Sequence, residues 1–289
     1  MKPTGSIRQY GHVFDDIAAE YDAFRSSYPS VLVDIALQRG GLHAGSRVLE
    51  VGSGTGKLTE LLIERQLVVD AVEPGQNMIA AARRRVGEAA SVTFHVGRFE
   101  DVELPKQAFD GLFSATAFHW VDPQVGWVKA ASHLKPDGLL ALLVYTGLRD
   151  EGTAEIQDGL RAIVQKHAPA VVARWRPLRD LDTIVAGVPE RLGNVSEVWD
   201  WLMSDGRHEM AVPNAASLFY DVNVETDVRI VDETADEFVA KMRTTSLYLQ
   251  LDPDRRKALE EDDRSFIEQH GRLRTPIATL LMTARRASA

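Results

Sequence analysis

The sequence has 289 residues, of which 45% are hydrophobic and 26% are charged. This balance is typical of a globular protein with about two domains or one enlarged α/β domain. The formal net charge of −9 argues against a nucleic-acid partner, because phosphate binding needs a concentrated basic face. Cysteine is absent, which excludes disulfides, thiolate metal sites and a cysteine nucleophile. The eight histidines form no metal-binding spacing, so we expect no metal site.

The sequence also predicts a protein without a membrane partner. The first thirty residues lack the apolar core of a signal peptide. The longest apolar stretch, residues 139–145, is far too short to cross a bilayer. We therefore expect a cytoplasmic protein, and the sequence leaves its oligomeric state open.

In chain order, a helix beginning near Pro29 and ending at Gly40 and Gly41 comes first. Strands and helices then alternate. Strands are predicted at 47–51, 68–73, 92–97, 109–116 and 138–145, and helices at 57–66, 77–86 and 125–134. The strands are rich in Val, Leu and Phe without strict alternation, which is typical of strands buried on both faces. This pattern predicts a doubly wound, mostly parallel sheet.

The second half of the chain changes character. Residues 149–213 are mainly helical and are predicted to form a cap insertion over the carboxyl ends of the strands. Residues 218–231 and 276–286 would add two strands, giving seven, and Thr234 with Glu237 forms a capping box that begins another helix. The expected organisation is a helical lid at 1–40, a cofactor-binding core at 41–148, the cap at 149–213 and completion of the sheet at 214–289.

The glycine loop "VLEVGSGTGKL", residues 48–58, follows the first strand of this core. The residues argue against a P-loop, because Gly56-Lys57 is followed by Leu58 and the glycine spacing is too short. The dinucleotide fingerprint is weakened because Lys57 occupies the place of the third glycine. Glu73 ends the next strand, about twenty residues past the loop, where a carboxylate can accept both hydroxyls of a ribose. A ribose site without a pyrophosphate cradle favours S-adenosylmethionine.

Five segments, "VLEVGSGTG", "AVEPGQNMIAAAR", "FHVGRFEDVELP", "FDGLFSATAFHWVDP" and "HLKPDGLLAL", resemble the successive motifs of class I S-adenosylmethionine-dependent methyltransferases. The two ends of the chain resemble more loosely the small-molecule branch that includes trans-aconitate methyltransferases. The resemblance implies that Gly52 and Gly54 approach the methionine part, that Glu50 orients its ammonium, and that Met78 lies against the adenine. The residues expected to bind the cofactor are Tyr21, Glu50, Gly52, Ser53, Gly54, Glu73, Pro74, Met78, Arg98, Phe99, Glu100 and Ser114.

One position departs from the family pattern. Many members have an aspartate after the third strand that accepts the adenine amino group, and this sequence has Arg98 there. Either Glu100 or Asp101 takes that role, or Arg98 stacks on the purine.

Two residues are candidates for the chemistry of methyl transfer. His119 follows the fourth strand at its carboxyl end and could remove a proton from a hydroxyl, or it could simply pack on Trp120. Arg25 could pair with a carboxylate of the substrate or cofactor, or form a surface ion pair. Tyr28, Trp120 and Tyr248 are the candidate substrate-binding residues.

The favoured function is methyl transfer from S-adenosylmethionine to a small-molecule acceptor, and a carboxylate or hydroxyl oxygen is the expected acceptor atom. A non-catalytic cofactor-binding or regulatory protein remains open, as does methylation of RNA or protein. An oxidoreductase is disfavoured by Lys57 in the loop.

Overall fold

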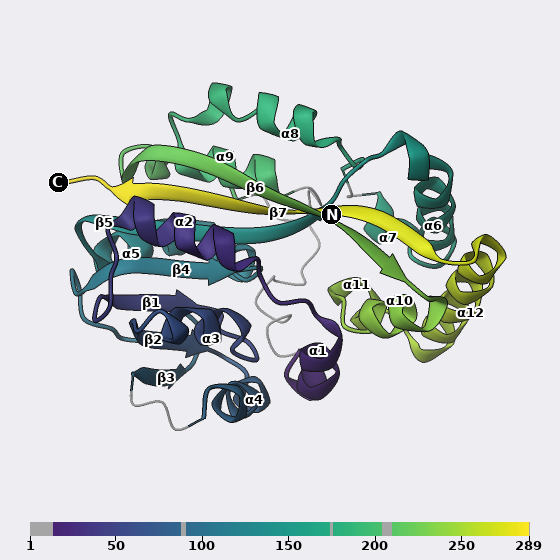
Figure 1. Cartoon of the computed structure of the whole chain (residues 1–289), viewed down its shortest axis with the longest axis horizontal. Helices are drawn as coiled ribbons and strands as arrows, with labels where there is room; N and C mark the ends of the chain where they lie inside the picture. Colours follow the sequence, from purple (N-terminus) through teal and green to yellow (C-terminus); the bar gives the residue numbers. More distant parts are fainter. Residues whose placement is uncertain (1–13, 88–90, 174–175, 204–209, 289) are drawn as a thin grey trace.

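The computed structural model describes residues 14–87, 91–173, 176–203 and 210–288. Its framework is one seven-stranded sheet with the order β3-β2-β1-β4-β5-β7-β6, shown in Figure 1. Strands β1 to β5 run parallel, and β7 runs antiparallel to both of its neighbours. The predicted doubly wound, mostly parallel sheet is confirmed. The strands are β1 Arg47–Val51, β2 Val68–Glu73, β3 Val92–Val96, β4 Phe109–Ala115, β5 Leu134–Gly147, β6 Phe219–Glu233 and β7 Leu273–Arg286.

Both faces of the central strands are buried, as their continuous apolar sequences predict. In β1, Val48 belongs to the core on one face, whereas Leu49 and Val51 belong to the core on the other. The first core includes side chains of α2 and α3, and the second includes those of α5 and α9. The sheet therefore separates two apolar layers, and its carboxyl edge is where the two layers leave room for ligands.

Helices cover the sheet and also gather beyond its edge. Figure 1 shows α1, α10 and α11 on the side toward which β1 and β4 point, with α6 and α12 further out. The helices are α1 Ala18–Phe24, α2 Ser30–Gly40, α3 Lys57–Glu64, α4 Gln76–Val86, α5 Pro123–His133, α6 Ala154–His167, α7 Pro169–Val172, α8 Leu181–Ala186, α9 Val195–Leu202, α10 Ala235–Met242, α11 Ser246–Leu249 and α12 Pro253–His270. Short 3₁₀ turns lie at η2 Asp15–Ile17, η3 Phe118–Trp120, η4 Glu151–Thr153, η5 Pro189–Arg191 and η6 Pro213–Ala215.

Strand β5 begins earlier than the sequence suggests. Residues 135–138 look like a turn, yet they continue β5, and Leu134 pairs with Phe109 of β4. The register shifts between Phe109 and Gly111, and Asp137 has φ +63°. The turn-forming residues therefore produce an irregularity within the strand rather than its beginning.

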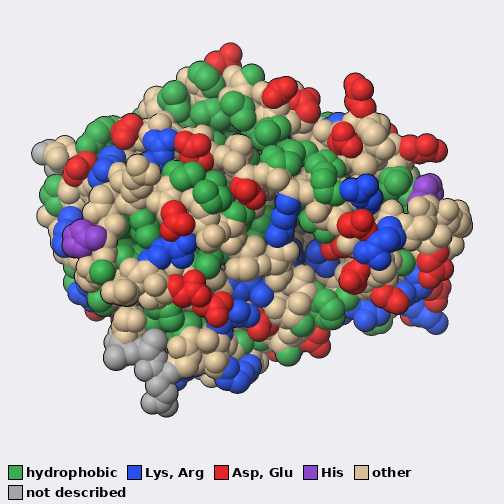
Figure 2. All heavy atoms as spheres, in the orientation of Figure 1, with side chains coloured by type: hydrophobic (Ala, Val, Ile, Leu, Met, Phe, Trp, Pro, Cys, Tyr) green, Lys and Arg blue, Asp and Glu red, His purple; other side chains and the backbone are tan. Residues whose placement is uncertain are grey.

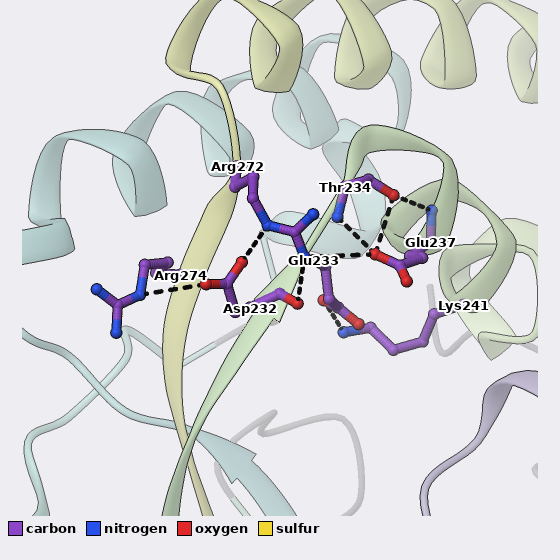
Figure 3. A network of polar contacts seen from close by, with 7 residues as sticks. All are labelled: Asp232, Glu233, Thr234, Glu237, Lys241, Arg272 and Arg274. Atoms are coloured by element: carbon purple, nitrogen blue, oxygen red, sulfur yellow. Dashed lines mark hydrogen bonds and ion pairs between the residues drawn. The ribbon is translucent and has the colours of Figure 1, made fainter.

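The C-terminal part of the chain attaches α10 firmly to the sheet. The predicted capping box is present: Glu237 N donates to Thr234 Oγ1 at 3.2 Å, and Thr234 N donates to Glu237 Oε2 at 2.8 Å. Figure 3 shows this box beside ion pairs that join Arg272 to Asp232 and Lys241 to Glu233. Because Lys241 belongs to α10 and the other partners lie on or next to β6 and β7, these contacts fix the helix at the sheet's carboxyl edge.

Candidate active site at the carboxyl ends of the strands

A cavity of about 500 Å³ lies where β1, β2, β4 and β5 end. One end is formed by the glycine loop and the residues that follow β2 and β3. The other end is formed by helices α6, α10, α11 and α12. The sequence-predicted residues that line it are Tyr21, Arg25, Gly52, Gly54, Glu73, Pro74, Met78, Arg98, Phe99, Glu100, His119 and Trp120.

The loop after β1 has a conformation that requires glycine. Gly52 has φ +75°, and a Cβ there would lie 2.2 Å from Cβ of Ala117. Gly54 has φ +53°, and a Cβ there would meet no protein atom within 4 Å. Because Gly54 lines the cavity, a side chain there would project into open space. The loop thus brings bare backbone against the cavity, as a cofactor that lies close to the main chain needs.

Glu73 ends β2 with a nearly buried carboxylate, which is 7% exposed. Its two oxygens accept hydrogen bonds of 3.0 Å from the backbone N–H groups of Gly54 and Gly75. Burial raises the pKa of Glu73 to about 7, although these two hydrogen bonds favour the ionised form. A carboxylate has further lone pairs, so Glu73 can also accept the two hydroxyls of a ribose.

Glu50, in the middle of β1, is fully buried and lines a smaller cavity of about 40 Å³. Thr59 Oγ1 donates to Glu50 Oε2 at 2.7 Å, and burial raises the pKa of Glu50 to about 7. Ser53 borders the same space, and its buried Oγ has no hydrogen-bond partner among the described residues. These polar groups fit a ligand ammonium, as the resemblance implies for the methionine part of the cofactor.

The residues after β3 form a polar cluster of their own. Arg98 Nη2 lies 2.5 Å from Glu100 Oε1, which also accepts the backbone N–H of Asp122 at 3.0 Å. Arg98 and Glu100 are therefore partners, and both line the cavity. Ser114 is different: its Oγ donates to the carbonyl of Val51 at 2.7 Å within the sheet, and it lines neither cavity.

The N-terminal segment lies against the cofactor end. Asp15 Oδ1 accepts the backbone N–H groups of Asn77 and Met78 at 2.7 and 3.0 Å, at the beginning of α4. This contact supplies a cap that the residue before α4, Gly75, cannot provide. Arg25 borders both cavities, and its Nη2 donates to the carbonyl of Thr244 at 2.8 Å. The segment thus connects α4 to the C-terminal helices across the site.

Asp22 of α1 makes the other attachment, because it binds Arg85 Nη2 at 2.6 Å and lies 3.5 Å from Lys57 Nζ. Arg85 also pairs with Glu60 at 3.0 Å. In the sequence, Arg83-Arg84-Arg85 looks like a solvated run at a helix end. That interpretation is wrong for Arg85, because α1 packs over α4 and brings a carboxylate to it.

The residues predicted to contact the acceptor do not share one site, because some line the main cavity, one borders the smaller cavity and one lines neither. His119, 6% exposed, and Trp120 lie on η3 and line the main cavity, with their ring centroids 5.0 Å apart. Tyr28 borders the smaller cavity, and its hydroxyl donates to Thr116 Oγ1 at 3.2 Å. Tyr248 lines neither cavity. It is half-buried, and its hydroxyl contacts Glu260.

Sequence reasoning missed the helical end of the cavity. The cap at 149–213 reaches it mainly through α6 and Met203, whereas Trp199 of α9 packs in the core against the sheet. Most of this end belongs to the C-terminal segment, which contributes Phe238, Lys241, Met242, Thr245, Ser246, Leu247 and Asp263. Residues 149–213 contribute Leu160, Val164 and Met203.

The sequence contains one indication that Asp263 is buried in an unusual place. Leu259, Asp263 and Ile267 recur every four residues along α12 and are all fully buried. An aspartate within an apolar stripe of a helix is unusual and marks a special environment.

Neither a metal cluster nor a membrane-spanning helix is found in the described part of the chain. No group of three or more metal-binding side chains occurs among them. No helix within that part of the chain is both long and apolar enough to cross a membrane.

Comparison with protein families identifies a methyltransferase domain at residues 49–142, the segment that begins within β1, ends within β5 and includes most of the cofactor end of the cavity. An uncharacterized methyltransferase of Mycobacterium tuberculosis is 36% identical over 155 residues, which are 54% of this chain and 60% of the relative. An uncharacterized methyltransferase of Staphylococcus carnosus is 32% identical over 144 residues, 47% of this chain and 67% of that protein. The match thus spans three fifths of the mycobacterial relative's length.

Two further comparisons bear on the acceptor and the fold. A tRNA (adenine(58)-N(1))-methyltransferase of Thermus thermophilus is 36% identical over 105 residues, 34% of this chain and 40% of that enzyme. A structure from Anaeromyxobacter dehalogenans, assigned as a type II methyltransferase, superposes with a TM-score of 0.57 at 20% identity. The superposition covers 91% of this chain and 97% of that one, and it shows a shared fold.

Proposed function

Because the chain belongs to the class I S-adenosylmethionine-dependent methyltransferases, we propose that it methylates a small molecule enclosed in the cavity. S-adenosylmethionine is the cofactor, and when bound it supplies a methyl group on a sulfonium that leaves as S-adenosylhomocysteine. The loose resemblance of the chain ends to trans-aconitate methyltransferases supports a small-molecule acceptor.

The observation that carries the proposal is the continuity of the cavity. The same space that borders Gly54 and Glu73 at the strand ends also borders Leu160 of α6, Met242 of α10 and Leu247 of α11. An acceptor in this second part would be surrounded by helices and largely removed from water. Such an enclosure suits a molecule of a few rings or a short chain, and it excludes water from the reacting atoms.

The charges on the surface favour the same reading. Acidic and basic side chains are interspersed on the face in Figure 2, and no continuous basic area extends across it. The net charge of the chain is −9. An RNA substrate would need a positively charged surface beside the site, so RNA is the weaker candidate despite the tRNA-modifying relative.

In this proposal, residues of the chain bind and orient both molecules. Glu73 accepts the ribose hydroxyls, Glu50 faces the ammonium, and the bare backbone of Gly54 allows close approach. The N-terminal segment acts as a lid, because Asp15 and Arg25 attach it to opposite sides of the site. Holding the reactants in one orientation and excluding water is the main contribution such a protein makes to a displacement reaction.

A screen with labelled cofactor tests this function. The protein would be incubated with S-adenosylmethionine labelled in the methyl group in three separate reactions. These contain a metabolite extract, total RNA and total protein. We expect label in a product of low molecular mass, identified by mass spectrometry. Label in RNA or protein alone would contradict the small-molecule proposal, and cofactor binding without any labelled product would favour a regulatory role.

We further propose that an oxygen atom accepts the methyl group. Variants of Arg25 and His119 distinguish a carboxylate oxygen from a hydroxyl oxygen. A carboxylate is ionised at neutral pH, so Arg25→Ala would lower the rate and His119→Ala would change it little. A hydroxyl needs its proton removed, so His119→Ala would then cost about 10²–10⁴-fold, and the rate would fall at acidic pH. The pH–rate profiles of both variants distinguish the cases. Full activity of both would remove these residues from the chemistry.

A further inference from the structure

Asp263 lies in the helical end of the cavity with a carboxylate that no side chain or backbone group of the described residues satisfies. The residue is 1% exposed, and neither of its oxygens has a hydrogen-bond partner among the described residues. An unpaired buried carboxylate is costly, so its presence calls for a partner that the described residues do not supply.

The nearby basic side chains of the neighbouring helices already have partners. Lys241 of α10 lines the cavity, but its ammonium contacts Glu233, as Figure 3 shows. Lys166 and His167 of α6 both bind Asp262, the residue next to Asp263, at 2.7 Å. Of the described charged side chains with which these helices line the cavity, Asp263 is therefore the one without a partner.

The surroundings of Asp263 in the cavity are mainly apolar. Val164 of α6, Phe238 and Met242 of α10, and Leu247 of α11 line this end. Burial among such groups and the nearby Asp262 raise the pKa of Asp263 to about 7. A cationic ligand group would favour the ionised carboxylate and use both of its free oxygens, whereas an anionic group would be repelled.

From the buried, unpartnered oxygens of Asp263 and the apolar walls around them, we propose that the acceptor carries a protonated amine on an apolar body, and that Asp263 binds this amine. The inference rests on the proposed function and adds the chemical class of its substrate. The amine is a recognition group at the helical end of the cavity. The methylated oxygen lies at the other end, toward Arg25 and His119. The acceptor is thus an amphoteric or hydroxylated amine rather than a simple acid.

Binding to the full chain saturated with S-adenosylhomocysteine tests the proposal without knowledge of the natural acceptor. The probes are n-alkylamines of three to eight carbons, with the n-alkanols and n-alkanoates of equal length as neutral and anionic counterparts. Calorimetry should show that the amine of best-fitting length binds at least tenfold more tightly than the alcohol, and that the alkanoates bind most weakly. Absence of binding throughout the amine series, or equal binding of the three series, would overturn the proposal.

Two variants locate the effect. Asp263→Asn should weaken binding of the amine ten- to a hundredfold and leave the alcohol unchanged, because a charged hydrogen bond is lost. Asp262→Asn is the matched control on the same helix. Because the Asp262 carboxylate is already bound to Lys166 and His167, its loss should change binding of the amine far less than the loss of the Asp263 carboxylate does. Equal amine affinity of Asp263→Asn and the unaltered protein would refute the assignment.

Titration with S-adenosylhomocysteine distinguishes a failure of the amine site from a failure of the proposed function. Unchanged affinity for it in Asp263→Asn, with loss of the amine, supports the inference. Failure of the unaltered chain to bind S-adenosylhomocysteine would instead contradict the proposed function. The comparison of the three probe series uses the unaltered protein only, so it decides the proposal even if a variant does not fold.

Discussion

Glu73 connects the end of one strand to both the glycine loop and the turn before α4, through the backbone N–H groups of Gly54 and Gly75. Glu73→Gln should weaken binding of S-adenosylhomocysteine by about 1–3 kcal/mol, because hydrogen bonds to a charged acceptor are lost. Burial raises the pKa of Glu73 to about 7, so affinity in the unaltered protein should rise between pH 6 and pH 8 as the carboxylate ionises.

Calorimetry across this pH range measures both effects of Glu73→Gln. The variant should lose the part of the pH dependence that belongs to Glu73, while the part due to Glu50, whose pKa burial also raises to about 7, remains. Glu64→Gln, on the exposed face of α3, is the control. An unchanged affinity in Glu73→Gln would reject the ribose assignment.

Gly54 offers a test of where the cofactor lies. Gly54→Val should lower the free energy of unfolding by about 1–2 kcal/mol, because valine is strained at φ +53°. Its side chain would also enter the cavity, so binding of S-adenosylhomocysteine should be lost. Gly41→Val is the control, since Gly41 has φ +63° and equally free space but lies at the end of α2, away from the cavity.

Chemical denaturation and calorimetry on both glycine variants give the answer. Similar losses of stability with a binding defect in Gly54→Val alone are expected. If both variants bind S-adenosylhomocysteine equally well, the space beside Gly54 is not part of the cofactor site.

At the scale of elements, the attachment of α1 to α4 decides how firmly the lid is held. Asp22→Asn removes the ion pairs with Arg85 and Lys57, which are partly exposed and worth about 1 kcal/mol together. Amide exchange in Ala18–Phe24 should therefore become roughly five times faster. Bound S-adenosylhomocysteine should slow it again if the segment closes over the site.

Hydrogen exchange detected by mass spectrometry makes this measurement. Asp158→Asn, which breaks an exposed ion pair with Arg149 elsewhere in the molecule, is the control and should leave α1 unchanged. Identical exchange of α1 in both variants, with and without ligand, would argue against a lid.

For the whole molecule, buried carboxyl groups should make stability depend on pH. Burial raises the pKa values of Glu50, Glu73 and Asp263 to about 7, above the values these groups have in an unfolded chain. The folded state then binds more protons between about pH 4 and pH 7, so the free energy of unfolding falls as pH rises through this window.

Asp263→Asn isolates one of these contributions. From pH 4 to pH 8, the free energy of unfolding of the variant should rise relative to that of the unaltered protein by on the order of 3–4 kcal/mol. The charged groups around Asp263 are the same in both proteins, so their own contributions cancel in the comparison. They are Asp262 with Lys166 and His167 of α6, and Lys241 with Glu233 near α10. Urea unfolding at several pH values measures the difference. Parallel pH profiles would show that Asp263 stays ionised in the folded protein.

The sequence by itself determined the sheet and the cofactor end of the site. Alternating strands and helices are local patterns, and the glycine loop and Glu73 lie at strand ends, which meet at one edge of any parallel sheet. The residues from Gly52 to Met78 could therefore be placed without knowledge of distant contacts. The extent of β5 was less predictable, because pairing with β4 overrode the turn-forming residues 135–138.

Only the tertiary structure decided what surrounds the acceptor. Arg25 reaches the carbonyl of Thr244, 219 positions away in the chain, and Asp263 joins the cavity because α12 packs on α6 and α10. The stripe of Leu259, Asp263 and Ile267 shows that one face of α12 is buried, but helical periodicity does not say which neighbour covers that face. Packing between distant helices makes that choice, and with it the charge that the acceptor meets.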